Sequence, residues 1–176
     1  SKGKANRHIL CNDRRTLVYL ANLACIPLHP WSSRAGSIEF PDFMIIDLDP
    51  GQGVPFSAVC RLALRVKEIL NQLSLNGYPK TSGSKGLHVV VPLDSRNDYK
   101  SVRRFAEVIA RLAVHSMGDL ATIERGMEKR KGKIYIDYLQ NGFGKTIVSP
   151  YCLRPRPGAP VSTPLNWSEV SSNIRP

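Results

Sequence analysis

Apolar residues recur along two stretches of the chain at the spacing of one helix face. Between residues 55 and 75 the recurring positions are Val59, Leu62, Val66, Ile69, Leu70 and Leu73. A second set, which ends near Met117-Gly118, consists of Val102, Phe105, Ile109 and Leu112. Residues three and four positions apart share one side of a helix, so both stretches are predicted to be amphipathic helices with that side buried. Pro55 suits the first turn of the earlier helix.

Shorter and more continuous apolar runs predict strands. These runs are residues 42–49 (DFMIIDLD), 86–93 (GLHVVVPL), 133–139 (KIYIDYL) and 145–151 (KTIVSPY). Pro50-Gly51 stops the first run, and Asn141-Gly142 joins the last two by a turn that suits a hairpin. Residues 16–26 (TLVYLANLACI) predict a short buried helix, which Pro27 closes. The elements together predict one α/β or α+β domain over residues 1–176, with a mixed or antiparallel sheet covered by helices.

The composition fits one such domain and argues against several other classes. The chain has 176 residues, of which 42% are hydrophobic, enough for a single core. No apolar run is long enough to cross a bilayer, and Ser1-Lys2-Gly3-Lys4 lacks the apolar core of a secretory signal. A cytoplasmic protein with no membrane partner is therefore expected. Widely spaced cysteines predict neither a disulfide nor a zinc site: Cys11, Cys25, Cys60 and Cys152.

The charge of the chain favours a polyanionic partner. Lys and Arg total 25 against 14 for Asp and Glu, which gives a formal net charge of +11. An excess of this size on a small domain is typical of proteins that bind nucleic acid. The same excess also suits simple solubility or an acidic membrane surface. Charge alone does not choose among these alternatives.

Two carboxylates in the first predicted strand point to metal chemistry. Asp47 and Asp49 lie two positions apart, and side chains two apart in a strand project from the same face. Adjacent carboxylates repel each other, and partial burial adds to the cost of ionising them. A divalent cation such as Mg²⁺ or Mn²⁺ removes both penalties.

A third carboxylate, Asp137, lies in another apolar strand between Ile136 and Tyr138. If the two strands are neighbours, three carboxylates meet and can hold two cations, one at an attacking hydroxyl and one at a triphosphate. The alternative is that D-L-D-P merely ends a strand before a turn. The third carboxylate and the loop described next favour the metal site.

Residues 80–88 (KTSGSKGLH) combine the features of a phosphate-binding loop. Gly83 and Gly86 allow backbone N–H groups to converge on an anion. Ser82 and Ser84 add hydroxyl donors, and Lys85 adds a positive charge. The spacing is not that of a P-loop, and an ordinary tight turn is the alternative.

Other polar residues follow the same strands. His88 comes directly after the glycine loop, which favours a phosphate contact, although a lone strand histidine is commonly a core residue. His29 and Trp31 are expected to serve packing. Further candidates for contacts with a triphosphate, base or sugar come from the basic segment 124–133, the end of the third predicted strand and the proline-rich tail: Arg130, Gln140, Arg154 and Arg156.

Together these segments resemble the primase-like polymerase domain of prokaryotic DNA ligase D, a member of the archaeo-eukaryotic primase superfamily that acts in end-joining repair. The resemblance rests on five stretches, which occur in the family's order and cover nearly the whole chain: LVYLANLACIPLHPW, FMIIDLDPGQGVPF, KTSGSKGLHVVVPL, IDYLQN and RPRPGAPVSTPL.

The resemblance implies a primase-polymerase core of the RRM-like kind that adds nucleotides to primer 3′-hydroxyl ends at double-strand breaks. It implies metal ligation by Asp47, Asp49 and Asp137, with Mn²⁺ or Mg²⁺ as the two divalent cations. It implies contacts with an NTP or dNTP, preferably a ribonucleotide, from the following residues: Ser82, Lys85, His88, Arg130, Gln140, Lys145, Arg154 and Arg156. The implied partners are DNA ends or a primer–template, the end-binding protein Ku and a DNA ligase, in the prokaryotic nucleoid.

One departure from the family concerns the start of the chain. Family members usually carry a segment upstream of the helix that resembles residues 16–26, with further nucleotide contacts and a site for a 5′-phosphate. This chain begins too late to include that segment. Two alternatives to nucleotide addition stay open: phosphodiester hydrolysis by the same carboxylates, and a non-catalytic module that binds DNA ends.

Overall fold

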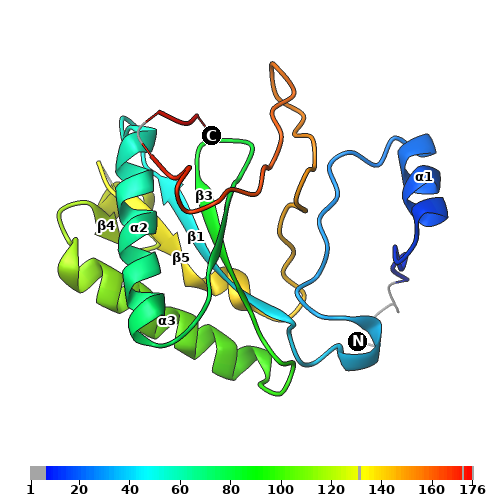
Figure 1. Cartoon of the computed structure of the whole chain (residues 1–176), viewed down its shortest axis with the longest axis horizontal. Coiled ribbons are helices and arrows are strands. Elements are labelled where there is room, and N and C mark those ends of the chain that lie inside the picture. Colours follow the sequence, from blue (N-terminus) through cyan, green and yellow to red (C-terminus); the bar gives the residue numbers. More distant parts are fainter. Residues whose placement is uncertain (1–6, 131, 172, 176) are drawn as a thin grey trace.

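A computed structural model describes residues 7–130, 132–171 and 173–175, and its centre is a five-stranded sheet (Figure 1). The α-helices are α1 (Arg14–Asn22), α2 (Phe56–Gln72) and α3 (Tyr99–Ser116). The strands are β1 (Phe43–Pro50), β2 (Tyr78–Thr81), β3 (Leu87–Pro92), β4 (Ala121–Thr122) and β5 (Ile134–Asp137). Three short 3₁₀ helices are η1 (Ala35–Ser37), η2 (Met127–Arg130) and η3 (Tyr138–Asn141). None of the helices in the described ranges is long and apolar enough to span a bilayer.

The sheet is mixed, as the sequence predicts. Its strand order is β2-β3-β1-β5-β4, in which β1 pairs antiparallel with both β3 and β5, and β2 pairs antiparallel with β3. Only the short edge strand β4 runs parallel to its neighbour β5. The central position of β1 places its side chains between those of β3 and β5.

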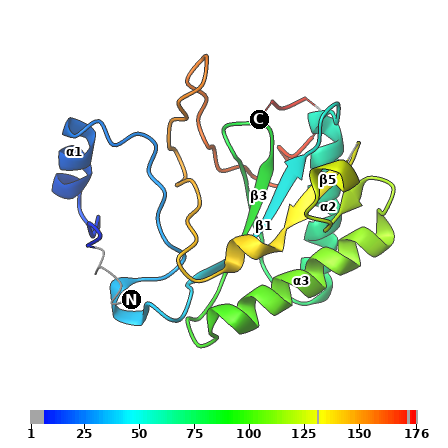
Figure 2. The same cartoon turned by 180° about the vertical axis from the view of Figure 1, so that it is seen from behind.

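The two faces of the sheet have opposite character. Met44, Ile46 and Leu48 of β1 are completely buried in a core that they share with the apolar sides of α2 and α3. Figures 1 and 2 show both helices on this one side of the sheet. Because successive strand residues alternate between faces, Asp47 and Asp49 project from the other face. The fold therefore backs the acidic face with a rigid apolar layer.

Both long helices agree with the predicted amphipathic stretches. Helix α3 begins after Asp98, whose carboxylate accepts a hydrogen bond of 2.7 Å from the Ser101 N–H. Helix α2 begins at Phe56, so Pro55 precedes the helix as its N-cap instead of occupying the first turn. The apolar pattern extends beyond the core, because three of its members are exposed: Leu73, Phe105 and Leu112.

The prediction of a buried helix at residues 16–26 is wrong about burial and about the C-terminal end. Helix α1 ends at Asn22, and Leu20 is its one buried residue. Both views place α1 apart from the sheet and its two covering helices (Figures 1 and 2). The chain after α1 instead pairs with a non-strand segment, since the carbonyls of Leu28 and Pro30 accept hydrogen bonds from the N–H groups of Ser149 and Ile147. The apolar residues of α1 therefore lie beyond the reach of the core.

The predicted hairpin around Asn141-Gly142 is also wrong. Strand β5 ends at Asp137, η3 follows, and residues 145–151 form no strand. Asn141 is buried, and its side-chain amide bonds to both the N–H and the C=O of Ile45, at 2.8 and 2.7 Å. The amide thus replaces a strand partner for β1, which explains why this Asn does not sit in an exposed turn. The apolar pattern also does not predict β2, whose last two residues fall in the predicted loop 80–88.

Candidate active site

Four polar residues form a row across the open face of the sheet. The strand register places Lys80 of β2 beside His88 of β3, His88 beside Asp47 of β1, and Asp47 beside Asp137 of β5. Asp49 lies two residues along β1 and faces Tyr135 of β5. The predicted neighbourhood of the three carboxylates is therefore a direct consequence of β1 and β5 being adjacent strands.

The carboxylates oppose each other's ionisation. Burial, the negative charge of Asp49 and that of Asp137 raise the pKa of Asp47 well above its ordinary value, although Lys80 acts in the opposite direction. Burial also raises the pKa of Asp49, with Asp137 as the next cause, whereas the positive charge of Arg130 lowers it. A buried group of like charges with this behaviour attracts a cation.

His88 lies against this group as a neutral imidazole. Its Nε2 is 3.4 Å from Oδ1 of Asp47, and its side chain is almost completely buried. Burial, followed by the charges of Lys80 and Arg154, lowers the pKa of His88 to about 3. The contact with Asp47 is therefore no ion pair at neutral pH. Within the described chain, His88 Nδ1 and Asp47 Oδ1 are both buried without a hydrogen-bond partner.

The donor chemistry of the three carboxylates fits a hard divalent cation. Their oxygens repel one another, and the unpartnered Oδ1 of Asp47 lacks a positive neighbour at hydrogen-bond distance. Across the residues that the structure describes, however, no three His, Cys, Asp or Glu side chains are arranged to hold a metal ion. Asp137 is engaged within the protein, because its Oδ1 accepts hydrogen bonds from Leu139 N–H and the Tyr135 hydroxyl, at 3.0 and 3.3 Å.

A cleft of about 260 Å³ opens beside the carboxylates. Eight of the ligands proposed from the sequence line it: Asp47, Asp49, Ser82, Ser84, His88, Gln140, Arg154 and Arg156. Its other lining residues are His29, Thr146, Ile147 and Val148. Gln140 is oriented by a hydrogen bond of 2.6 Å from its Nε2 to the carbonyl of Thr146. The lining of the cleft thus combines carboxylates with arginines.

The glycine loop packs tightly between β1 and the proline-rich tail. The Ser82 hydroxyl accepts hydrogen bonds from the N–H groups of Ser84 and Gly86, at 3.2 and 3.0 Å, which closes the loop on itself. Gly83 has a φ of +63°, a conformation that favours glycine. A Cβ on Gly86 would lie 2.4 Å from the carbonyl oxygen of Leu48. Glycine is therefore required for the loop to approach β1.

Three predicted basic residues lie outside the lining of the cleft. Lys85 and Lys145 are exposed. Arg130 stacks its guanidinium 3.6 Å from the centre of the Tyr135 ring and donates to the carbonyls of Glu124 and Arg125. It is near enough to Asp49 to lower the pKa of that carboxyl. Arg130 therefore borders the acidic group, whereas the two lysines have no described contact with it.

The sequence pattern does not single out Lys80, and it does not predict that His29 lies in the cleft. Lys80 is 3% exposed, and its Nζ donates a hydrogen bond of 2.7 Å to Oγ of Ser162. Burial lowers the pKa of Lys80 to about 8, against the opposing effect of Asp47. His29, expected to serve packing, lines the cleft, and burial lowers its pKa. Strand alternation would have placed Lys80 on the acidic face had β2 been recognised.

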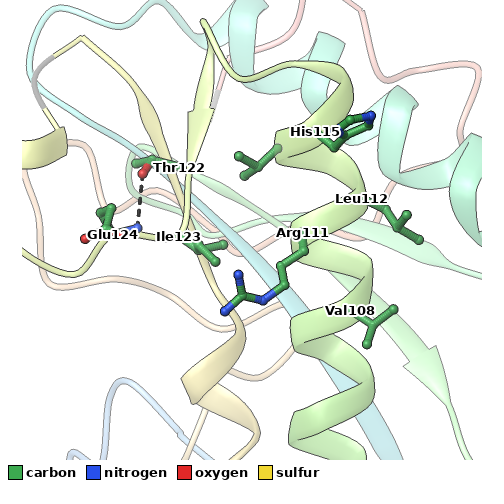
Figure 3. A pocket seen from close by; sticks show the side chains of 8 residues that line it. Val108, Arg111, Leu112, His115, Thr122, Ile123 and Glu124 are labelled. Carbon is green, nitrogen blue, oxygen red and sulfur yellow. Dashed lines mark hydrogen bonds between the residues drawn. The ribbon is translucent and has the colours of Figure 1, made fainter.

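A larger hollow, of about 580 Å³, lies between α3 and residues 122–124 (Figure 3). Its wall is mainly apolar, with Val108 and Leu112 on α3 and Ile123 opposite them. Glu124 contributes the one carboxylate of the lining. The smaller cleft has the clustered acids, hydroxyls and arginines that suit phosphate chemistry, so it is the candidate active site despite its size.

An acidic group on the open face of a helix-backed sheet, next to a glycine loop and arginines, is the arrangement expected of a nucleotidyltransferase of the primase-polymerase class. The family model "LigD, primase-polymerase domain" matches residues 1–176. The chain belongs to this family of nucleotidyltransferase domains.

Individual relatives agree with the family assignment. The chain is 35% identical over 173 residues to the bifunctional non-homologous end joining protein LigD of Bacillus subtilis (strain 168), covering 98% of this chain and 28% of that protein. It is 34% identical over 156 residues to the multifunctional LigD of Pseudomonas aeruginosa, covering 89% of this chain and 19% of the relative. The chain thus spans less than a third of the length of these relatives.

A solved structure shares the fold. The polymerase domain from Mycobacterium tuberculosis ligase D, in complex with DNA, superimposes with a TM-score of 0.82 at 32% identity. The match covers 90% of this chain and 58% of that one. The likeness extends over nearly all of the chain described above, and that relative binds DNA.

Proposed function

We propose that the chain adds nucleotides from nucleoside triphosphates to the 3′-hydroxyl end of a primer strand during the end joining of DNA breaks. The observation that carries the proposal is the cleft itself, whose lining brings Asp47 and Asp49 together with Arg154, Arg156 and two serines of the glycine loop. Carboxylates next to a phosphate-binding wall suit phosphoryl transfer, where catalysis depends on positioning and on charge compensation.

Each group in the cleft has a distinct task in this reaction. Asp47, Asp49 and Asp137 would hold divalent cations, Mn²⁺ or Mg²⁺, which supply charge compensation at the attacking and leaving oxygens. Arg154 and Arg156 bind phosphate oxygens of the incoming triphosphate, since guanidinium groups match them in geometry. Ser82 keeps the glycine loop closed, so its backbone N–H groups keep a fixed direction. Gln140, held by Thr146, contacts the sugar or base.

The names of the relatives support a wider context for this activity. We propose DNA ends or a primer–template as the second substrate, with a ribonucleotide as the preferred triphosphate. Ku and a DNA ligase are the proposed partners, and the bacterial cytoplasm at the nucleoid is the proposed location. Lys85, Arg130 and Lys145 stand at the margin of the cleft, where they would meet the outer phosphates or the DNA backbone.

A primer-extension assay tests the proposal against its two alternatives. The protein is incubated with a labelled primer–template, Mn²⁺ and ribonucleotides, and in parallel with a primer that ends in a 3′-deoxy sugar. We expect elongation of the first primer and no change in the second, because the 3′-hydroxyl is the attacking group. Shortening of both primers would instead indicate phosphodiester hydrolysis, and binding without chemistry would indicate a module that only docks DNA ends.

DNA affinity should fall steeply as salt rises. Each phosphate that a Lys or Arg neutralises releases counterions, which gives a slope of about −0.9 in log affinity against log salt for each contact. Replacing the exposed Lys145 with Gln should reduce that slope by about one and weaken binding equally on DNA of unrelated sequences. Fluorescence anisotropy at several salt concentrations measures both effects. A flat salt dependence would mean that the charge of +11 serves solubility instead.

His88→Ala should weaken nucleotide use and also lower the melting temperature. The imidazole is neutral and buried next to Asp47, so its loss removes a neutral contact and leaves a cavity. The expected rise in KM for the triphosphate is about tenfold or less, and primer–template affinity should not change. The exposed His115 provides the control, His115→Ala, which should leave both quantities near the wild-type values. A destabilised His88→Ala variant with normal KM would make His88 a core residue only.

A further inference from the structure

The proline-rich tail forms an ordered strap, defined here as residues 149–165, whose C-terminal part runs antiparallel beside the edge strand β2. Its C-terminal arm is hydrogen-bonded to β2 by Thr81 N–H to Thr163 C=O, at 2.9 Å, and by Leu165 N–H to Pro79 C=O, also at 2.9 Å. The Thr81 hydroxyl accepts a further hydrogen bond of 3.0 Å from Thr163 N–H. These bonds fasten one arm of the strap to the edge of the sheet.

The other arm of the strap carries Arg154 and is bonded to the first. Tyr151 N–H donates to Ser162 C=O at 2.7 Å, Ser162 N–H donates to Cys152 C=O at 3.0 Å, and Arg154 N–H donates to Pro160 C=O at 2.9 Å. The strap therefore doubles back on itself, and both backbone groups of Ser162 are bonded to the other arm. Whatever fixes Ser162 also fixes the backbone from which the Arg154 side chain enters the cleft.

Lys80 is the charged residue that reaches Ser162 from the sheet. Its Nζ lies 2.7 Å from Oγ of Ser162, and the same hydroxyl donates at 2.8 Å to the carbonyl of Thr81. Ser162 is completely buried and Lys80 is 3% exposed. Taking an ammonium group out of water is costly, so a buried lysine needs hydrogen bonds and opposite charge to offset the lost hydration. Asp47, two strands away in the same row, supplies part of the compensating charge.

The glycine loop also packs closely against the strap, at Gly83. A Cβ on Gly83 would lie 2.7 Å from Cγ of Arg154, 2.9 Å from the Ser162 nitrogen and 3.0 Å from the Val161 carbonyl carbon. Arg154 Nε is buried and, within the described residues, has no hydrogen-bond partner. Arg154 lines the cleft, and its Nε–H is a donor to which an anion could bind.

We propose that Lys80 is a positioning residue of the nucleotide site, which acts through Ser162 to hold Arg154 where it meets the phosphates of the triphosphate. This inference rests on the proposed function, because it assumes that the anion in the cleft is a triphosphate. Lys80 does not contact the nucleotide. Its ammonium group bonds the strap, at Ser162, to the row of polar residues that includes Asp47. This bond sets the distance between the carboxylates and Arg154.

The test compares Lys80→Met and Ser162→Ala with the double variant. Each single change should raise KM for the triphosphate about tenfold, because a charge-assisted hydrogen bond is removed, while kcat changes by about threefold at most. The KM of the double variant should be no higher than that of the more impaired single variant, since both changes break the same hydrogen bond. Lys100→Met, which removes an exposed lysine of α3, is the matched control and should leave KM unchanged.

Binding of inorganic tripolyphosphate, measured by calorimetry, separates this inference from the proposed function. We expect Lys80→Met to weaken tripolyphosphate binding about tenfold even if the wild-type protein extends no primer, in which case only the proposed function fails. If Lys80→Met does not fold, Ser162→Ala decides by the same measurement. Unchanged tripolyphosphate affinity in a folded variant, additive effects in the double variant, or a wild-type protein that does not bind tripolyphosphate would each overturn the inference.

Discussion

Replacing Asp47 or Asp49 with Asn should reduce nucleotide addition by about a thousandfold or more, because a cation-binding carboxylate contributes several kcal/mol to charge compensation in phosphoryl transfer. The same changes should preserve or raise the melting temperature at neutral pH. Burial and mutual repulsion raise the pKa of both carboxyls in the folded protein, so their ionised forms destabilise it. The stability that the raised pKa provides is present at low pH and is lost as pH rises through the folded-state pKa.

The exposed Asp119 provides a control with the same change in net charge. Asp119→Asn should leave both nucleotide addition and the melting temperature near the wild-type values. Steady-state kinetics and differential scanning calorimetry measure the two quantities in parallel. Wild-type activity in Asp47→Asn would remove that carboxylate from the cation site, and lost activity with a large loss of stability would make its role structural.

Gly86→Ala should destabilise the protein by about 1 to 3 kcal/mol or more, the range expected when extra atoms are forced into a packed site. The new Cβ would lie 2.4 Å from the Leu48 carbonyl oxygen, and β1 is the central strand that cannot shift without disturbing two neighbours. It would also stand 3.4 Å from Oδ1 of Asp49. Activity should therefore fall further than the folded fraction alone explains.

Gly36 offers the matched control, because a Cβ there meets nothing within 4 Å. Gly36→Ala should change the free energy of unfolding by no more than about 0.5 kcal/mol. Urea denaturation of both variants gives the comparison. Equal stability of the two variants would contradict the close approach of the glycine loop to β1.

The parts of the fold that the sequence predicts are those in which local pattern and tertiary packing agree. Helices α2 and α3 each bury one continuous apolar side, and β1 alternates apolar residues with Asp47 and Asp49. The spacing of two carboxylates in a strand requires a shared face whatever the tertiary structure. Their meeting with Asp137 needed one further fact, the pairing of β1 with β5, which no local pattern contains.

The parts that the sequence does not predict depend on contacts between distant segments. Strand β2 is short and begins with an exposed Tyr78, so its residues have no clear alternation of apolar and polar positions. The strap has no regular secondary structure, and its order comes from Ser162 and Thr81, about eighty residues apart along the chain. Helix α1 carries an apolar pattern like that of a core helix, yet it lies apart from the sheet, and Leu20 is its one buried residue.

The most direct test of the central claim follows the primer and the triphosphate in one reaction. Wild-type protein, a primer–template, Mn²⁺ and a single ribonucleotide are incubated together, and both primer length and released pyrophosphate are measured. We expect one pyrophosphate for each nucleotide added, and neither product with Asp47→Asn. Pyrophosphate without elongation, a shortened primer, or elongation that persists in Asp47→Asn would contradict the proposed nucleotide addition.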